Sequence, residues 1–259
     1  MRDIIGHSDV VMITLDTLRY DVAQAAWRDG DLKGLAPYLG PDGWEERHSP
    51  GSFTYAAHHA FFSGFLPTPI QPGNHPRPFA AEFAGSTTVS DSTFLFREAT
   101  LPEALARHGY STVCIGGTGF FNQQNALSRA LPGLFQEAVW EPELGVTSPQ
   151  SQTHQVDRAL ASIEGKERVF LFLNIAAIHQ PNWFYAFSNE CPDNLDSHRA
   201  ALLAVDEALI RLWDELRRRG PAFVIICSDH GTCYGEDGYT GHRIGHRLVW
   251  TVPYKEFRI

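Results

Sequence analysis

The most informative part of the sequence is Phe223-Val224-Ile225-Ile226-Cys227-Ser228-Asp229-His230-Gly231. A run of apolar, mostly β-branched residues stops at an acid, an imidazole and a glycine, which predicts a buried strand with two polar side chains at its carboxyl end. In open α/β sheets, ligands bind in the crevice beyond the carboxyl ends of the strands. A carboxylate beside an imidazole suits a divalent metal, although a histidine at this point can equally belong to a plain turn.

Other parts of the chain repeat this pattern of strand and helix. Apolar runs predict strands at Asp9–Leu15, Ser111–Ile115 and Val169–Ile175, and residues 155–163 and 198–219 have helical spacing. Alternating strands and helices predict an α/β fold, a three-layer α/β/α sandwich with a largely parallel central sheet. Because no repeat or composition break marks a boundary, we expect one domain over residues 1–259.

Composition excludes several classes of protein. The chain has 259 residues and a formal net charge of -9, and its only basic cluster is Arg217-Arg218-Arg219, so we expect no nucleic-acid partner. The sequence contains no apolar run long enough for a signal peptide or a membrane span, which predicts a cytoplasmic protein without a membrane partner. The four cysteines show no CxxC spacing and are expected to be ordinary thiols. The sequence does not determine the oligomeric state.

Two further residues are candidates for the same edge of the sheet. Asp16 ends the first predicted strand and is either a helix cap or a ligand. A turn from Ser49 leads to a short helix over residues 56–62 that ends at Gly64. Thr54 precedes this helix, where it is either a cap or a nucleophile. The Pro-rich and Gly-rich residues 67–92 predict a long surface excursion, which either extends over the site or lies away from it.

Together these motifs resemble the alkaline phosphatase superfamily, specifically its sulfatase-like branch. The resemblance covers Asp9 to about Pro253 and includes the early strand ending in Asp, a Ser-Pro-x-x-x-Thr stretch closing in Ser-Gly, and a later strand followed by His179-x-Pro. It also includes Ser-Asp-His-Gly with a further histidine downstream. The fold that it implies is alkaline phosphatase-like.

The nucleophile position departs from that of the sulfatases. Their motif runs Cys-x-Pro-Ser-Arg and ends in Thr-Gly, and counting back from Gly64 puts Thr54 at the position of the cysteine. His58 stands where the arginine would be, and Gly117 stands where sulfatases place a lysine. The chain is therefore not expected to be a formylglycine sulfatase.

A threonine at this position resembles the phosphoethanolamine transferases, nucleotide pyrophosphatases and phosphonate hydrolases of the superfamily. The first of these have a histidine twelve residues after the histidine of Ser-Asp-His-Gly, and twelve residues after His230 is His242. Their histidine that precedes a proline after a strand matches His179. The membrane segments of those transferases have no counterpart in this sequence, so lipid transfer is not implied.

The resemblance implies a set of site residues. The ligands of one divalent metal would be Asp16, Thr54, Asp229 and His230. Thr54 would also be the nucleophile, with His179 and His242 as further catalytic residues. A second metal or the substrate would be held by residues among His179, His242, His246 and His58. His246 would share a face with His242 if residues 241–246 were helical.

Two-metal members of the superfamily add an aspartate to the second site, and Asp196 and Asp206 are the candidates, although Asp206 fits the exposed face of its helix better. Zinc or manganese suits the donor set best, and magnesium or calcium suits it less well.

The function that the resemblance implies is metal-dependent hydrolysis of a small anionic ester. The ester would be a phosphodiester, phosphomonoester or phosphonate, with a sulfate ester less expected, and the reaction would pass through a covalent phospho-threonine. Two alternatives are a phospho-group transferase and a non-catalytic scaffold or binding protein. A mutase would need a cap domain, and residues 67–92 are too few to form one.

Overall fold

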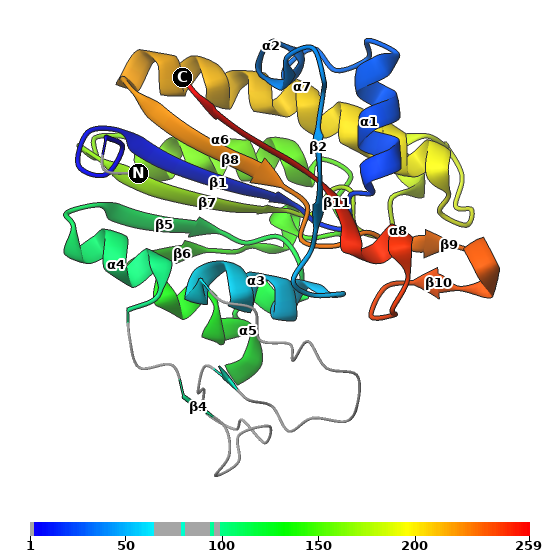
Figure 1. Ribbon diagram of the computed structural model, residues 1–259, viewed down its shortest axis with the longest axis horizontal. Coiled ribbons are helices and arrows are strands. Elements are labelled where there is room, and N and C mark those ends of the chain that lie inside the picture. The colour runs from blue at the N-terminus through cyan, green and yellow to red at the C-terminus, as the bar shows by residue number, and fades with distance from the viewer. Residues whose placement is uncertain (1–2, 65–78, 81–93, 96–98) are drawn as a thin grey trace.

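The computed structural model describes residues 3–64, 79–80, 94–95 and 99–259 (Figure 1). A seven-stranded sheet forms its centre, in the order β2-β11-β8-β1-β7-β5-β6. Its strands are β1 Asp9–Leu15, β2 Glu45–His48, β5 Ser111–Ile115, β6 Glu137–Val139, β7 Val169–Ile175, β8 Ala222–Cys227 and β11 Thr251–Arg258. Two-stranded sheets are formed by β3 Phe79–Ala80 with β4 Phe94–Leu95, and by β9 Cys233–Tyr234 with β10 Thr240–Gly241.

The pairing of the strands explains where polar side chains collect. β1 lies between β7 and β8 and is parallel to both, and β5 continues the parallel part of the sheet beside β7. Since all these strands run the same way, their carboxyl ends meet at one edge. β11 runs antiparallel to β8 and to β2, so the sheet is mixed at that side.

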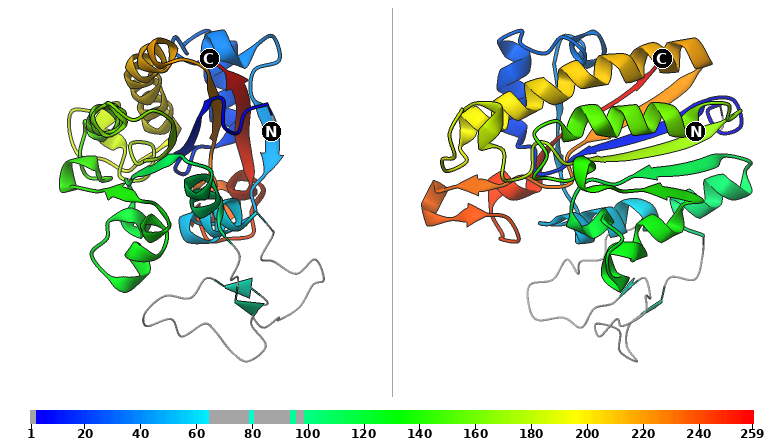
Figure 2. Two further views of the ribbon diagram at one scale, coloured as in Figure 1. Left: turned by 90° about the vertical axis from the view of Figure 1, so that its left-hand side faces the viewer. Right: turned by 180° about the vertical axis from the view of Figure 1, so that it is seen from behind.

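Helices cover both faces of the sheet (Figure 2). The α-helices are α1 Tyr20–Arg28, α2 Ala36–Leu39, α3 Thr54–Ser63, α4 Leu101–Arg107, α5 Ala126–Ala130, α6 Ser151–Ile163, α7 Leu195–Arg219 and α8 Arg247–Trp250. The 3-10 helices are η1 Gly119–Phe121, η2 Pro132–Leu134, η3 Pro142–Leu144, η4 Trp183–Tyr185 and η5 Glu236–Gly238. One apolar core lies between the sheet and α1, α6 and α7, and a second, richer in phenylalanine, lies on the side of α3 and α4. The predicted α/β/α sandwich is confirmed.

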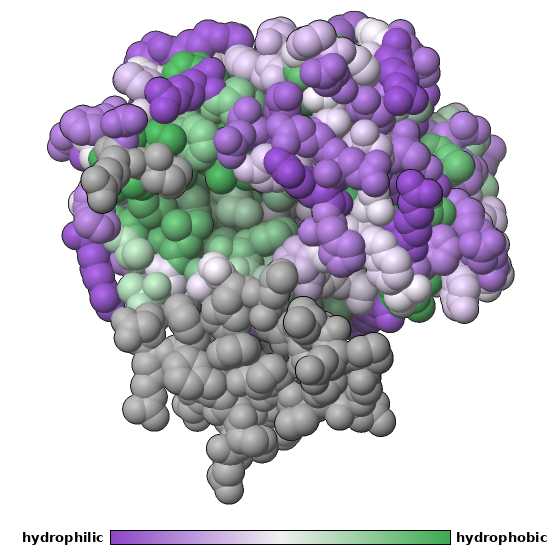
Figure 3. Space-filling view, in the orientation of Figure 1, coloured by the Kyte–Doolittle hydropathy of each residue, from purple (hydrophilic) through white to green (hydrophobic). Residues whose placement is uncertain are grey.

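The face of the sheet that carries α3 and α4 is hollowed. The space-filling view shows hydrophobic side chains gathered in this hollow (Figure 3). A cavity of about 330 Å³ on the same face is lined by Met12, Phe61, Leu101, Ile225 and Tyr254, with others. Among the described residues, no helix combines the length and the apolar character that a membrane crossing requires.

Several elements differ from the sequence prediction. β2 and β11 were not expected, because their exposed and charged residues hide the alternation typical of strands. α3 begins at Thr54 and α7 at Leu195, each earlier than predicted. Residues 241–246 are not helical, so the condition under which His242 and His246 would share a helical face is not met. The excursion predicted at residues 67–92 lies largely outside the described residues.

Candidate active site

Two buried carboxylates lie at the carboxyl edge of the sheet. Asp16 follows β1 and Asp229 follows β8, and the register that pairs Thr14 with Cys227 brings the two strand ends side by side. His230 comes directly after Asp229, and its Nε2 lies 3.4 Å from Asp229 Oδ2 and 3.8 Å from Asp16 Oδ1. Donor atoms of the three residues all lie within 4.8 Å of one another, and all three side chains are fully buried.

The hydroxyl of Thr54 completes this cluster. Thr54 is the first residue of α3, after an extended Phe53, and is almost fully buried. Its Oγ1 lies 3.3 Å from Asp16 Oδ2 and 3.3 Å from His230 Nε2. The start of a helix places backbone N–H groups and the positive end of the dipole beside this hydroxyl, where they favour an anion. The structure therefore brings together the four residues that the resemblance implied as metal ligands.

The two carboxylates have opposite pKa shifts. Burial raises the pKa of Asp229 well above its usual range, and the nearby charge of Asp16 raises it further. For Asp16 the same burial effect is outweighed by His179, by His230 and by a hydrogen bond from Asn174, so that its pKa is lowered. Two acids this close cannot both ionise easily without a cation between them.

The donor set fits a divalent cation. Asp16 Oδ1 and Asp229 Oδ2 are buried and accept no hydrogen bond in the described part of the chain. His230 Nδ1 lies 2.9 Å from the carbonyl oxygen of Gly231, which assigns the ring proton to Nδ1 and leaves a lone pair on Nε2, the atom that faces the carboxylates. Burial lowers the pKa of His230, so the ring is neutral near pH 7, as a metal ligand must be.

His179 and His242 lie next to this cluster. The ring centroids of His230 and His242 are 4.6 Å apart, and those of His242 and His179 are 5.7 Å apart. Burial, together with the charges of His230 and His179, lowers the pKa of His242 to about 4. His242 Nδ1 is buried and unpartnered among the described residues. Both rings therefore lie where they can contact a bound ion or substrate, and the His242 ring can offer its Nδ1 as a neutral imidazole nitrogen.

His58 lies beneath the cluster, inside the protein. Its ring is fully buried among aromatic side chains, including those of Phe121 and Phe172. Its Nδ1 is 2.7 Å from the carbonyl oxygen of Thr54 and 3.7 Å from Asp229 Oδ2, and its Nε2 is 2.9 Å from Thr14 Oγ1. These contacts suit a residue that holds α3 against the sheet rather than one that touches substrate.

His246 is not brought to the cluster. It precedes α8, where its Nδ1 lies 3.3 Å from Cys233 Sγ and accepts the N–H of Leu248. Its Nε2 lies 3.0 Å from Asp237 Oδ2. His242 and His246 do not share a helical face, because Gly241 ends β10 and the chain then bends.

Neither aspartate proposed for a second metal reaches the cluster. Asp206 is buried rather than on an exposed helix face, and its carboxylate accepts the backbone N–H groups of Lys33, Gly34 and Leu35 at 2.6–2.8 Å. It therefore anchors the loop after α1. Asp196 lies exposed in the first turn of α7.

Asn174, which was not predicted from the sequence, also belongs to the site. Its Nδ2 donates to Asp16 Oδ2 at 3.0 Å, and its Oδ1 accepts both the N–H and the hydroxyl of Thr118 at 2.9 Å. The side chain is thus fixed on one side and orients Asp16 on the other. The signal was present, because Asn174 is the only polar residue in the strand Val169–Ile175.

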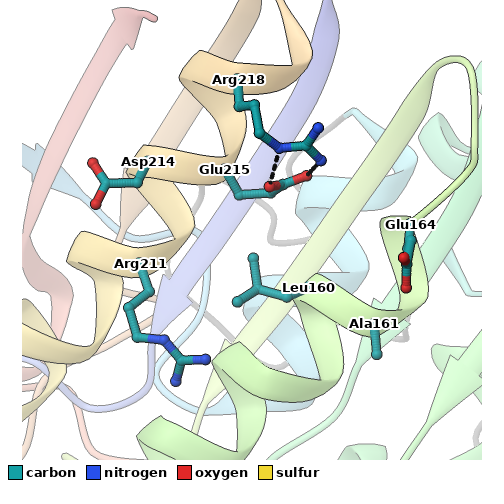
Figure 4. Close-up of a pocket in the computed structure, with 7 residues that line it drawn as sticks. All are labelled: Leu160, Ala161, Glu164, Arg211, Asp214, Glu215 and Arg218. Atoms are coloured by element: carbon teal, nitrogen blue, oxygen red, sulfur yellow. Dashed lines mark hydrogen bonds and ion pairs between the residues drawn. The ribbon is translucent and has the colours of Figure 1, made fainter.

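A larger cavity lies elsewhere and contains none of the cluster residues. It measures about 480 Å³ and lies between α6 and α7, lined by Arg211, Arg218 and Glu215 with others. Figure 4 shows Arg218 paired with Glu215. Arg211 forms an ion pair with Asp157. Because these charges are already paired, this cavity is a surface groove between two helices rather than a prepared site.

Comparison with known proteins identifies the family. A family model described as Sulfatase matches residues 48–254, which is more than half of the chain. The chain belongs to the sulfatase family. Membership indicates an enzyme that acts on phosphate or sulfate esters, with a site able to bind a divalent metal. No curated protein matches the chain significantly.

Solved structures of the alkaline phosphatase superfamily share the fold of this sulfatase-family chain. The C-terminal periplasmic domain of phosphoethanolamine transferase EptC from Campylobacter jejuni is 15% identical, with a TM-score of 0.63 over 97% of this chain and 79% of that one. The soluble domain of lipooligosaccharide phosphoethanolamine transferase A from Neisseria meningitidis is 16% identical, with a TM-score of 0.63 over 98% and 77%. The periplasmic domain of EcEptC from Escherichia coli, solved as a complex with Zn, is 12% identical, with a TM-score of 0.65 over 97% and 72%. At these identities the likeness shows the fold alone.

Proposed function

We propose that this chain hydrolyses phosphate-type esters with Thr54 as the nucleophile. The observation that carries the proposal is the position of Thr54 Oγ1, 3.3 Å from both Asp16 Oδ2 and His230 Nε2 at the start of a helix. A free threonine hydroxyl is a weak nucleophile at neutral pH and needs activation. A divalent ion held by Asp16, Thr54, Asp229 and His230 would supply it by lowering the pKa of the hydroxyl.

The reaction proceeds in two displacements. Thr54 Oγ1 attacks phosphorus and the bond to the leaving oxygen breaks. The hydroxyl proton, which points toward Asp16 Oδ2, passes to water or to the leaving oxygen, and the alcohol or phenol departs. Water then attacks the phospho-threonine, releasing phosphate, a phosphate monoester or a phosphonate according to the substrate, and the Thr54 hydroxyl regains a proton. His179 and His242 bind and orient the oxygen atoms of the substrate beside the cluster.

Phospho-group transfer is the second candidate function. It is supported by the names of the structural neighbours, several of which are phosphoethanolamine transferases. Transfer needs the same phospho-threonine and differs only in the acceptor, which replaces water. The two functions therefore share the first step and separate at the second.

The experiment is a substrate series measured together with metal content. Bis-p-nitrophenyl phosphate, p-nitrophenyl phosphate, a phenylphosphonate ester and p-nitrophenyl sulfate are offered to the wild type and to Thr54→Ala. We expect turnover of a phosphorus ester that is lost in the variant and on chelation. The proposal would be overturned if the wild type bound no stoichiometric metal and hydrolysed none of the four esters after zinc or manganese was supplied. That result would favour a non-catalytic scaffold protein.

A further inference from the structure

An arginine that neither the sequence motifs nor the family assignment singles out lies at the rim of the cluster. Arg243 directly follows His242, whose ring contacts that of His230. Its backbone N–H donates to the carbonyl oxygen of Ser52 at 2.8 Å, two residues before Thr54. Its φ of 68° lies in the left-handed region, which a residue with a side chain adopts only when its surroundings require it. The backbone of Arg243 is therefore held against the segment that carries the nucleophile.

The guanidinium group of Arg243 rests on aromatic rings instead of on a carboxylate. Its Cζ lies 5.1 Å from the ring centroid of Phe53 and 5.9 Å from that of Phe120. Within the described part of the chain no carboxylate forms an ion pair with it, whereas Arg19, by contrast, is paired with Asp21. The side chain is exposed, so its N–H groups are available to an anion.

The charge of Arg243 acts on the cluster. Burial is the largest cause of the lowered pKa values of His230 and His242, and neighbouring imidazoles and Asp16 act on them as well. The positive charge of Arg243 is a smaller cause that also lowers both pKa values. The two positions at which sulfatases place an arginine and a lysine hold no cation in this chain. His58 is buried with its pKa lowered to about 4, mainly by burial, and Gly117 is packed against the carbonyl oxygen of Asn174 without room for a side chain.

We propose that Arg243 binds the free oxygen atoms of the substrate's phosphoryl group while Thr54 attacks it. Displacement at phosphorus needs positive charge around these oxygens, and the planar guanidinium matches two of them at once. The inference rests on the proposed function and adds to it the protein's own cation for the substrate. The rings of Phe53 and Phe120 limit the freedom of the side chain, which lowers the entropy lost on binding.

The test compares three variants with the wild type, all loaded with metal. Arg243→Asn removes the positive charge, and asparagine tolerates the left-handed backbone conformation at this position. Arg243→Lys keeps the positive charge but lacks the planar guanidinium that can bind two oxygen atoms at once. Arg247→Asn is the control, since Arg247 is also exposed but lines a separate cavity with Tyr20 and Asp21. The measurements are kcat and KM for the preferred aryl ester, and the affinity for inorganic phosphate by calorimetry.

We expect Arg243→Asn to raise KM and the Kd for phosphate about tenfold or more, as for loss of a charged hydrogen bond, with a smaller change in kcat. The KM and phosphate Kd of Arg243→Lys should lie between those of the wild type and of Arg243→Asn. Both values for Arg247→Asn should match the wild type. An active wild type whose KM and phosphate Kd are unchanged in Arg243→Asn overturns the inference and leaves the proposed function standing. If no variant turns over any ester, calorimetry decides alone: weaker phosphate binding in Arg243→Asn supports the inference, and equal binding overturns it.

Discussion

At the residue scale, Asp16 depends on a neighbour that keeps it ionised and oriented. Asn174 donates to one carboxylate oxygen and leaves Oδ1 without a hydrogen bond in the described residues. The amide is itself fixed by the N–H and hydroxyl of Thr118, so it cannot rotate away. Residues that orient metal ligands in this way contribute to metal affinity without touching the ion.

We therefore expect Asn174→Leu, which keeps the approximate volume of the side chain and removes its polar atoms, to weaken zinc or manganese binding about 10- to 100-fold. The measurement is competition with a coloured chelator. Asn182→Leu is a control, because this buried amide lies in another network, with Ser197 and Tyr234. Equal metal affinity in wild type and Asn174→Leu would contradict the role given to Asn174.

At the element scale, the turn after β8 is held by a close approach of two backbones. A Cβ added at Gly231 would lie 2.0 Å from the carbonyl oxygen of Leu248, while the N–H of Gly231 donates to Val249 at 2.7 Å. The backbone at the start of α8 thus packs directly against Gly231, the residue that follows His230. The position has no room for any side chain.

Gly231→Ala should lower the free energy of unfolding by about 1–3 kcal/mol, as overpacking does in a well-packed interior. Chemical denaturation monitored by circular dichroism measures it. Gly133→Ala is the matched control, because a Cβ there meets nothing within 4 Å. Equal denaturation midpoints for the two variants would show that α8 is not packed closely against Gly231.

The contact between the start of α1 and α7 predicts a pH dependence of stability. His198 on α7 accepts the backbone N–H of Arg19 at Nε2, and its Nδ1 lies 2.9 Å from the hydroxyl of Tyr234. Burial, assisted by the charge of Arg19, lowers the pKa of His198 to about 3. The unfolded chain, with a pKa of about 6.5, binds this proton more readily.

The contribution of His198 to the free energy of unfolding is therefore fully present above about pH 6.5. It is lost as the pH falls toward the pKa of His198 in the folded protein. We expect the free energy of unfolding to fall by up to about 1.4 kcal/mol per pH unit below pH 6 from this residue alone. His198→Gln should show a shallower slope in the same urea titrations. Parallel slopes would mean that other buried groups carry the whole effect.

Much of this arrangement could be predicted from the sequence, for identifiable reasons. Buried parallel strands have continuous apolar runs, so β1, β5, β7 and β8 were correctly placed, and polar residues at their ends indicated the edge with the site. Asp206 was misjudged because its partners, Lys33 to Leu35, are far away in sequence and are backbone groups, which leave no side-chain pattern. Arg243 was missed because its neighbours Phe53 and Phe120 come from distant segments.

At the scale of the whole molecule, the cluster joins elements from both ends of the chain. Asp16 follows β1, Thr54 begins α3, and Asp229 and His230 lie in the loop after β8. Without a cation, two buried acids oppose each other where these segments meet, and a bound ion would relieve that repulsion. Binding to the folded state alone stabilises it by mass action, by about 4 kcal/mol at a thousand times the Kd.

Metal loading should therefore raise the melting temperature, and a chelator should reverse the change. Differential scanning calorimetry with and without zinc or manganese measures this effect. The control is a variant with both Asp16→Asn and Asp229→Asn, which replaces the two acids by neutral groups of similar shape. A wild type that responds to metal no more than this variant would place the metal elsewhere.

The central claim is that Thr54 becomes covalently phosphorylated during turnover. The most direct measurement is mass spectrometry of metal-loaded protein quenched in acid during reaction with p-nitrophenyl phosphate, followed by peptide mapping. We expect a single added phosphoryl group on the peptide that contains Thr54, present in the wild type and absent from Thr54→Ala. Steady turnover with an unmodified Thr54 peptide, or a phosphoryl group on another residue, would contradict it.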